Sequence, residues 1–143
     1  MGKNGRARTT EQRDQAGSAA VELALILPLL LLLVSGIIDF GRMLNVQLTL
    51  SSAAREGARW AALNQTSPSP AARAQAVATA DGVTATVSVT GCSTPPAPNT
   101  NATVIATNAY SPITPIRAIS TLLGGSFPAT ITLTGRGVMR CGG

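Results

Sequence analysis

The chain of 143 residues contains no histidine and only 3% aromatic residues. Without histidine it lacks the commonest general base and the commonest metal ligand, which excludes a Ser-His-Asp hydrolase and a His-ligated zinc site. Acidic residues are also few, at six, and no pair of them is placed as in a catalytic cleft. We therefore expect no enzyme activity, no metal and no cofactor.

Basic residues are in excess, and the formal net charge is +5. Nucleic-acid binding would need clustered Arg and Lys interleaved with aromatic side chains on which bases can stack. No stretch of this chain has that combination, so the excess charge does not indicate a nucleic-acid partner. The basic residues instead lie before and after one apolar run, with few in the last 80 residues.

The apolar run covers residues 18–38 and predicts a transmembrane helix. As a helix its 21 residues span about 31 Å, close to the roughly 30 Å hydrocarbon core of a bilayer. Pro28 removes one helical donor and should kink the helix gently. The basic leader before the run predicts a cytoplasmic N-terminus and an extracytoplasmic remainder. The alternative is a secretory signal peptide, but Ser35-Gly36 lacks a small-x-small cleavage pattern.

Glu22 lies four residues inside this apolar stretch, where an ionised acid is unfavourable. It could lie at the membrane interface, because the first turns of a helix favour an acid. Alternatively, a protease could cut after Gly17, whose lack of a side chain permits close approach. The cut would free an α-amine on Ser18, one turn from Glu22 of the same chain or beside Glu22 of a neighbouring helix. Pairing with that cation would turn Glu22 into an assembly residue.

Residues 17–63 resemble the TadE-like proteins of the tight-adherence (Flp) pilus system, which have a type IV prepilin-like leader. The resemblance rests on Gly17 to Glu22 before the leucine run, on Asp39-Phe-Gly-Arg42, and on Ala53-Ala-Arg-Glu-Gly-Ala-Arg59. It implies cleavage after Gly17 by a prepilin peptidase and places Glu22 five residues into the mature chain. It also implies a major pilin, other minor pilins or assembly-platform proteins as partners.

The helical pattern continues past the membrane to about Leu63. One stripe of this extension is rich in Ala and Gly, which permits close packing against a sheet or another helix. It could simply be the spine of a small domain. The opposite face, which carries Arg55, Glu56 and Arg59, is charged and should be solvated. The predicted packing stripe comprises Met43, Val46, Leu50, Ala53, Ala54, Gly57, Trp60 and Ala61.

The remaining residues predict a small α+β domain in which an antiparallel sheet is laid on the long helix. Alternating apolar residues indicate strands, and Ser69-Pro70 and Gly82 mark the ends of a short helix. The predicted elements are a helix at 70–80, a strand at 83–89, a loop at 91–100, a strand at 102–110, a helix at 112–123 and a strand at 130–134, extending towards 139.

Cys92 follows the first predicted strand and Cys141 follows the last. If the middle strand is antiparallel to both, the two cysteines meet at one end of the sheet and should form a disulfide outside the cytoplasm. A metal pair or a redox couple is the alternative. Neither fits two cysteines 49 residues apart with no histidine and no two-residue spacing.

Together with the charge and hydropathy pattern, the resemblance implies a pilin-like protein that acts in pilus assembly or adhesion. We expect it in a bacterial cytoplasmic membrane, crossing it once, or carried into a pilus or onto the cell surface. It would act as a minor pilin or pseudopilin. The alternative is a single-pass membrane scaffold or binding protein whose leader is never cut. The predicted segments are a cytoplasmic leader at 1–17, a transmembrane helix at 18–38, a helix extension at 39–63 and an extracytoplasmic domain at 64–143.

Overall fold

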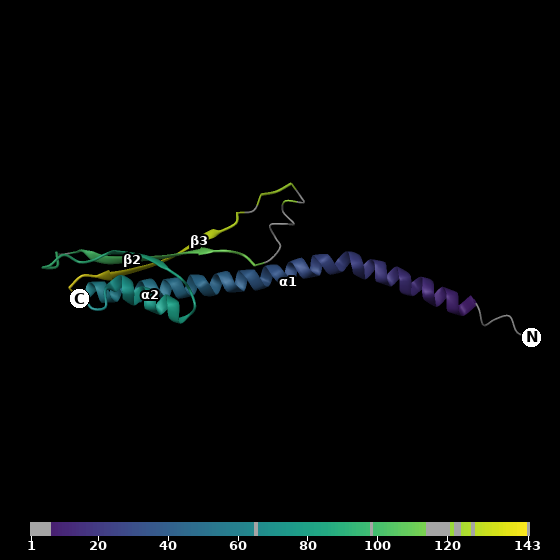
Figure 1. Ribbon diagram of the computed structural model, residues 1–143, viewed down its shortest axis with the longest axis horizontal. Helices are drawn as coiled ribbons and strands as arrows, with labels where there is room; N and C mark the ends of the chain where they lie inside the picture. The colour runs from purple at the N-terminus through teal and green to yellow at the C-terminus, as the bar shows by residue number, and fades with distance from the viewer. Residues whose placement is uncertain are drawn as a thin grey trace, which may run out of the picture. The chain divides into compact units, whose positions relative to one another are not determined.

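A computed structural model describes residues 7–64, 66–97, 99–113, 121, 124–126 and 128–142, and for 7–16 the backbone alone. The chain divides into two compact units, Met1–Ile38 and Asp39–Gly143. The long helix α1 supplies the first unit and begins the second (Figure 1). The elements are α1 (Ala7–Ala62), α2 (Pro70–Ala80), β1 (Thr86–Thr90), β2 (Asn101–Tyr110) and β3 (Ile131–Arg140).

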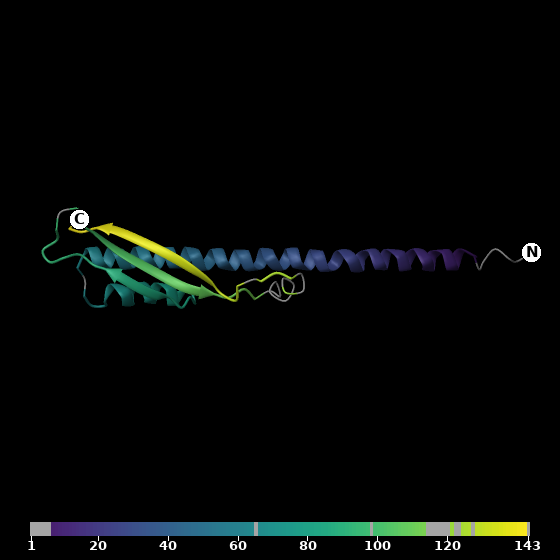
Figure 2. The ribbon, with the colours of Figure 1, turned by 90° about the horizontal axis from the view of Figure 1, so that it is seen from above.

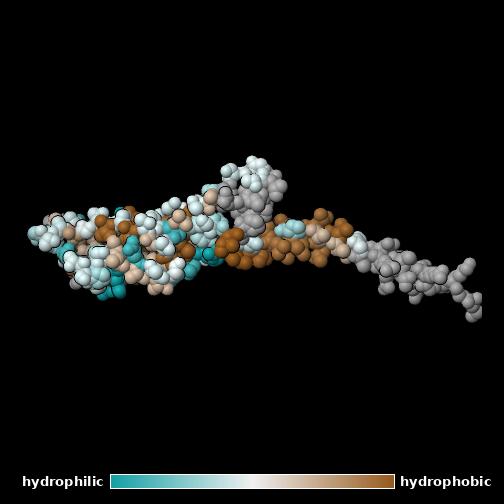
Figure 3. Space-filling model, viewed as in Figure 1, coloured by the Kyte–Doolittle hydropathy of each residue, from teal (hydrophilic) through white to brown (hydrophobic). Residues whose placement is uncertain are grey.

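The described part of the first unit is a helix whose large apolar side chains are exposed. From Val21 to Ile38 these side chains are between 37% and 76% exposed. Figure 3 shows the corresponding apolar surface, in brown. The helix from Gly17 onward is long and apolar enough to cross a membrane, and none of its most apolar window is buried within the chain. Exposed leucines at this density fit a lipid environment, in which no water competes for the helical backbone.

The second unit has two layers. The second half of α1 and the short α2 form one layer, and a three-stranded antiparallel sheet in the order β1-β2-β3 forms the other (Figure 2). The ten residues of β2 pair in register with all ten of β3, from Asn101↔Arg140 to Tyr110↔Ile131. The predicted α+β class, with a long apolar helix packed on a small antiparallel sheet, is confirmed.

The core between the layers is built mainly from small side chains. Leu50 of α1 and Val104 of β2 are its largest fully buried members. Most other buried residues are alanines, which lets the helix axis lie close to the sheet. Inward and outward residues alternate along β2 and β3, as a sheet with one covered face requires. The buried alanines are Ala53, Ala54, Ala58, Ala61, Ala74, Ala78, Ala102 and Ala106.

Helix α2 spans the predicted residues, with Ser69 as its N-cap and Pro70 in the first turn. The Ser69 hydroxyl accepts the Ala72 N–H at 3.2 Å. At the other end Gly82 adopts φ +73°, and the Val83 N–H donates to the Ala78 carbonyl at 2.9 Å. These are the features of a Schellman cap, which favours glycine in the left-handed position.

The first strand begins later than the alternating pattern predicts, at Thr86 instead of residue 83. Val83 is part of the cap that ends α2, so its backbone is committed to the helix terminus. Its side chain is nevertheless buried, and Ala85, Val87 and Val89 pack against the core on the same face. The helix predicted over 112–123 falls mostly on residues outside the described part of the chain.

Candidate functional site

The predicted cleavage and assembly residues lie on α1 in the first unit. Gly17, Ser18 and Glu22 are all exposed. Nothing lies within 4 Å of the position that a Cβ on Gly17 would take. Ser18 and Glu22 are four residues apart in the helix, so they lie on one face. Among the described residues, nothing packs against this segment.

The predicted packing stripe lies under the sheet of the second unit. Leu50, Ala53 and Gly57 are buried, while Met43 and Val46 pack partly against the same core. Trp60 is half-buried, and its indole N–H donates to the Pro68 carbonyl at 2.6 Å. The sheet and α2 of the same chain cover this stripe. These contacts are those of a spine of the small domain, and they occupy the surface that another helix would need.

Two glycines of β3, Gly135 and Gly137, allow the strand to lie directly on the α1 backbone. A Cβ on Gly135 would overlap the Leu50 carbonyl group and lie 2.6 Å from the Ser51 nitrogen. A Cβ on Gly137 would overlap the Ala54 carbonyl group. Two residues of a strand advance about 6.6 Å and four residues of a helix about 6 Å, so successive inward positions of β3 meet successive turns of α1.

The 53–59 motif is explained in large part by packing. A Cβ on Gly57 would lie 2.9 Å from the Ala74 Cβ and 3.2 Å from Val104 Cγ1, so a glycine at 57 admits both α2 and the sheet. Glu56 is half-buried, and its carboxylate accepts two N–H groups of Arg73 on α2, each at 3.1 Å. The Arg73 guanidinium also lies 5.5 Å from the centroid of the Trp60 ring. Glu56 and Gly57 thus join α1 to α2.

Asp39 of the second motif holds the end of β2. The Tyr110 hydroxyl donates to the Asp39 carbonyl at 3.1 Å, and the Ile113 N–H donates to the Asp39 carboxylate at 3.2 Å. The Arg42 guanidinium lies 4.0 Å from that carboxylate and 5.9 Å from the Tyr110 ring centroid. Burial, followed by the negative charge of Asp39, raises the pKa of Tyr110, and Arg42 partly opposes this.

Cys92 and Cys141 form a disulfide, with their Cα atoms 5.7 Å apart. Cys92 lies just beyond β1 and Cys141 just beyond β3, at the same end of the sheet. The Cys141 N–H donates to the Thr100 carbonyl at 3.0 Å, which extends the β2–β3 pairing by one step. The bridge joins the two edge strands through their C-terminal ends, as the antiparallel order predicts.

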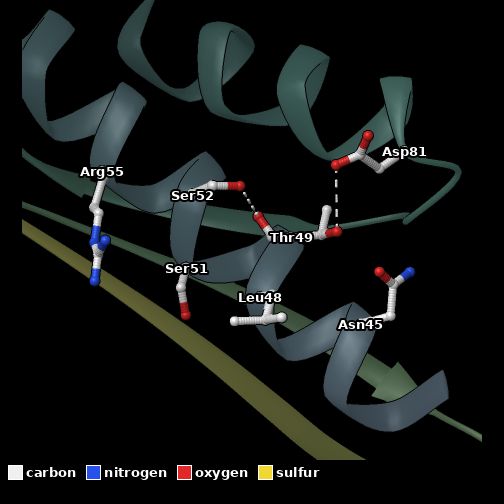
Figure 4. Close-up of a pocket in the computed structure, with 7 residues that line it drawn as sticks. All are labelled: Asn45, Leu48, Thr49, Ser51, Ser52, Arg55 and Asp81. Carbon is white, nitrogen blue, oxygen red and sulfur yellow. Dashed lines mark hydrogen bonds between the residues drawn. The ribbon is translucent and has the colours of Figure 1, made fainter. Parts of the chain in front are cut away.

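A hollow of about 500 Å³ opens beside α1 near the end of α2 (Figure 4). The Thr49 hydroxyl donates to the Asp81 carboxylate at 3.3 Å, and the Ser52 hydroxyl donates to the Thr49 carbonyl at 2.9 Å. No group of three metal-ligating side chains occurs among the described residues. The hollow is lined by Asn45, Leu48, Thr49, Ser51, Ser52, Arg55 and Asp81.

Over the described residues the chain is an α+β protein with one candidate membrane span, and Gly17, Ser18 and Glu22 near the start of that span are exposed. A family model described as TadE-like protein matches residues 17–59. The match begins at Gly17 and ends at Arg59, so the resemblance to the TadE-like family is confirmed over the residues that carry it. No curated protein matches the chain significantly. No solved structure matches it significantly either.

Sequence reasoning missed two contributors to the arrangement. The Gly-x-Gly at 135–137 stands in alternate positions of a strand, which is the signal for a close backbone approach. The second contributor is Asp39, which accepts hydrogen bonds from Tyr110 and Ile113, residues more than 70 positions away in the sequence. No local pattern encodes such a contact.

Proposed function

We propose that the protein is a minor pilin or pseudopilin of a tight-adherence pilus system. The observation that carries the proposal is the family match, because it starts at the predicted cleavage residue Gly17 and runs through the whole apolar segment. The exposed apolar side chains of the first unit support a membrane role for that segment. The protein would be a substrate and a building block, with no chemistry of its own.

In this proposal a prepilin peptidase cuts after Gly17, and the new α-amine of Ser18 neutralises Glu22. A carboxylate in an apolar setting is stabilised only when a cation and hydrogen bonds accompany it. If the amine belongs to the next subunit, the pairing also fixes how far one helix slides along another. The major pilin, other minor pilins or assembly-platform proteins would supply that neighbour.

The proposed topology places the N-terminus in the cytoplasm and the second unit outside. The basic leader favours this direction. The Cys92–Cys141 disulfide supports it independently, because such bridges persist in oxidising compartments and are rare in the cytosol. Both observations support an extracytoplasmic sheet domain, on the side where a pilus would be assembled.

Mass spectrometry of the protein extracted from membranes of cells that contain the peptidase tests the proposal. We expect a mature chain that begins at Ser18. The variant Gly17→Val should accumulate with its leader retained, because the added side chain obstructs the protease. The matched control Gly36→Val makes the same change within the apolar segment, at another position with nothing within 4 Å, and should be cut normally. A wild-type chain that keeps its leader would favour the alternative of an uncleaved membrane scaffold.

A further inference from the structure

Two arginines of the 53–59 motif, Arg55 and Arg59, are not explained by the packing of the domain. Both are exposed on α1. Arg42 pairs with Asp39 and Arg73 with Glu56, and within the described part of the chain neither Arg55 nor Arg59 has a carboxylate partner. Two guanidinium groups one helical turn apart are a concentrated positive charge.

The same side of α1 carries exposed apolar residues nearer the apolar segment. Phe40, Leu44 and Leu48 are 60%, 49% and 64% exposed. At 100° per residue these three positions and the two arginines fall within an arc of about 100°. We call this surface the mixed face, defined by Phe40, Leu44, Leu48, Arg55 and Arg59. It is turned away from the stripe that packs beneath the sheet.

In the residues that the structure describes, no acid of the domain forms an ion pair with the arginines of the mixed face, although Asp81 lines the same hollow as Leu48 and Arg55. Residues 39–143 contain seven arginines and only three acids, which leaves a formal charge of +4. Each acid is already engaged: Asp39 accepts from Ile113, Glu56 from Arg73, and Asp81 from the Thr49 hydroxyl. The excess of four positive charges leaves most of the charge on the mixed face to water and salt, or to another molecule.

We propose that the mixed face docks a helix of a different polypeptide, apolar near the membrane and acidic about two turns further on. At the level of Phe40 to Leu48, the exposed apolar residues would pack against apolar side chains of the neighbouring helix. About 10 Å along the helix, the two arginines select carboxylates. The inference deepens the proposed function and rests on it, because it names the class of subunit that this membrane protein meets.

A second copy of this chain fits the mixed face poorly. Two copies anchored in one membrane point in the same direction, so parallel packing through this face would bring Arg55 and Arg59 level with the same residues of the neighbour. Like charges at an interface suppress a pairing, and opposite charges select one. The charge pattern therefore favours a heterotypic contact over self-association.

Photo-crosslinking in living cells tests the charge rule directly. Two differently tagged copies of the full chain are co-expressed in a bacterial host without a tight-adherence system, with p-benzoylphenylalanine at position 48 of one copy. Wild-type copies should crosslink to each other weakly. Pairing the wild type with the variant Arg55→Glu/Arg59→Glu should raise the crosslink at least about fivefold, because the variant presents the acids that the proposal requires.

The matched control is Arg136→Glu/Arg140→Glu, which makes the same change in net charge on β3. It should leave the wild-type level of crosslinking unchanged. Four results would overturn the proposal. Two concern the variants: no gain with Arg55→Glu/Arg59→Glu, or an equal gain with the control. The other two are strong crosslinking between wild-type copies and crosslinks to lipid alone. A second measurement in the same cells, supplied with the peptidase, tests the pilin proposal separately: mass spectrometry of the N-terminus. A retained leader would refute cleavage, but it would not change the comparison of crosslinking between charge variants.

Discussion

Gly135 of β3 rests on the main chain of Leu50 in α1. The space that a Cβ would occupy is already filled by the Leu50 carbonyl group, with the Ser51 nitrogen 2.6 Å away. Because the obstructing atoms belong to a helix backbone, they cannot move aside as a flexible side chain would. This contact brings the edge strand within reach of the long helix and lets Leu50 itself be fully buried.

Gly135→Ala should destabilise the second unit by about 1–3 kcal/mol, the range observed when a methyl group is forced into a packed interface. Alanine in a strand is otherwise better than glycine by about 0.5–1 kcal/mol, so an unobstructed site would give the opposite sign. Urea unfolding of the full chain in detergent, followed by the fluorescence of the single tryptophan, Trp60, measures the change. Gly91→Ala is the control, because nothing lies within 4 Å of its Cβ position. Equal stability of the two variants would contradict the close approach.

The architecture was predictable where local patterns and packing agree. Three sequence features each predicted one type of element: the apolar run of α1, the N-cap and proline of α2, and the alternation in β2 and β3. The structure contains these elements. The stripe of small residues predicted a close contact, and in the structure Ala53 and Gly57 lie buried. The sequence did not determine which element packs on the stripe, because Ala53 or Gly57 can accommodate a sheet or a helix equally well.

The polar contacts between distant segments were not predictable in the same way. Asp39 looked like the end of a membrane segment, and only the fold brings Tyr110 and Ile113 to it. Similarly, Glu56 was assigned to a solvated face, whereas it is half-buried and paired with Arg73. Such pairings depend on how two elements pack, which neither hydrophobic periodicity nor composition encodes.

Tyr110 should ionise above the ordinary tyrosine pKa of 10.0, because burial and the Asp39 charge both disfavour the phenolate. It is the single tyrosine of the chain, so absorbance at 295 nm during a pH titration reports it directly. In Asp39→Asn the midpoint should fall but stay above 10.0, since burial, the larger cause, remains. Asp81→Asn removes an acid that contacts Thr49 instead, and should leave the midpoint where it is.

The same pKa change predicts how stability depends on pH. The folded state holds the Tyr110 proton more tightly than the unfolded state, so the contribution is fully present below the unfolded pKa of about 10 and is lost as the pH rises through the folded value. Urea midpoints of the wild type and Tyr110→Phe should therefore converge or cross above pH 10. Parallel pH profiles for the two proteins would show that the phenol does not titrate differently on folding.

The disulfide should contribute about 4 kcal/mol, the chain-entropy value for closing a loop of about 50 residues. Cys92→Ser/Cys141→Ser should lower the free energy of unfolding by about that amount, and adding a reductant to the wild type should reproduce the loss. The reductant should have no effect on the double variant, which serves as the control. Thiol labelling of the protein recovered from cells should find neither cysteine reactive; two reactive thiols would contradict both the bridge and the proposed export of this domain.

Glu22→Ala should leave membrane insertion and cleavage intact but abolish assembly. The substitution makes the helix more apolar, so insertion is not impaired, while the Ser18 amine loses the carboxylate that neutralises it. Since every 1.4 kcal/mol is a factor of ten, the loss of a buried pair worth about 3 kcal/mol should reduce recovery with sheared filaments at least about a hundredfold.

Two further variants separate the charge of Glu22 from its size. Glu22→Asp keeps the carboxylate on a shorter side chain and should retain part of the assembly. Leu23→Ala removes a similar volume from the adjacent position without changing charge, and should assemble nearly as the wild type does. If Glu22→Ala is recovered with filaments as efficiently as the wild type, Glu22 is an interfacial residue whose acid is favoured only by the start of the helix, and the pairing with the Ser18 amine is wrong.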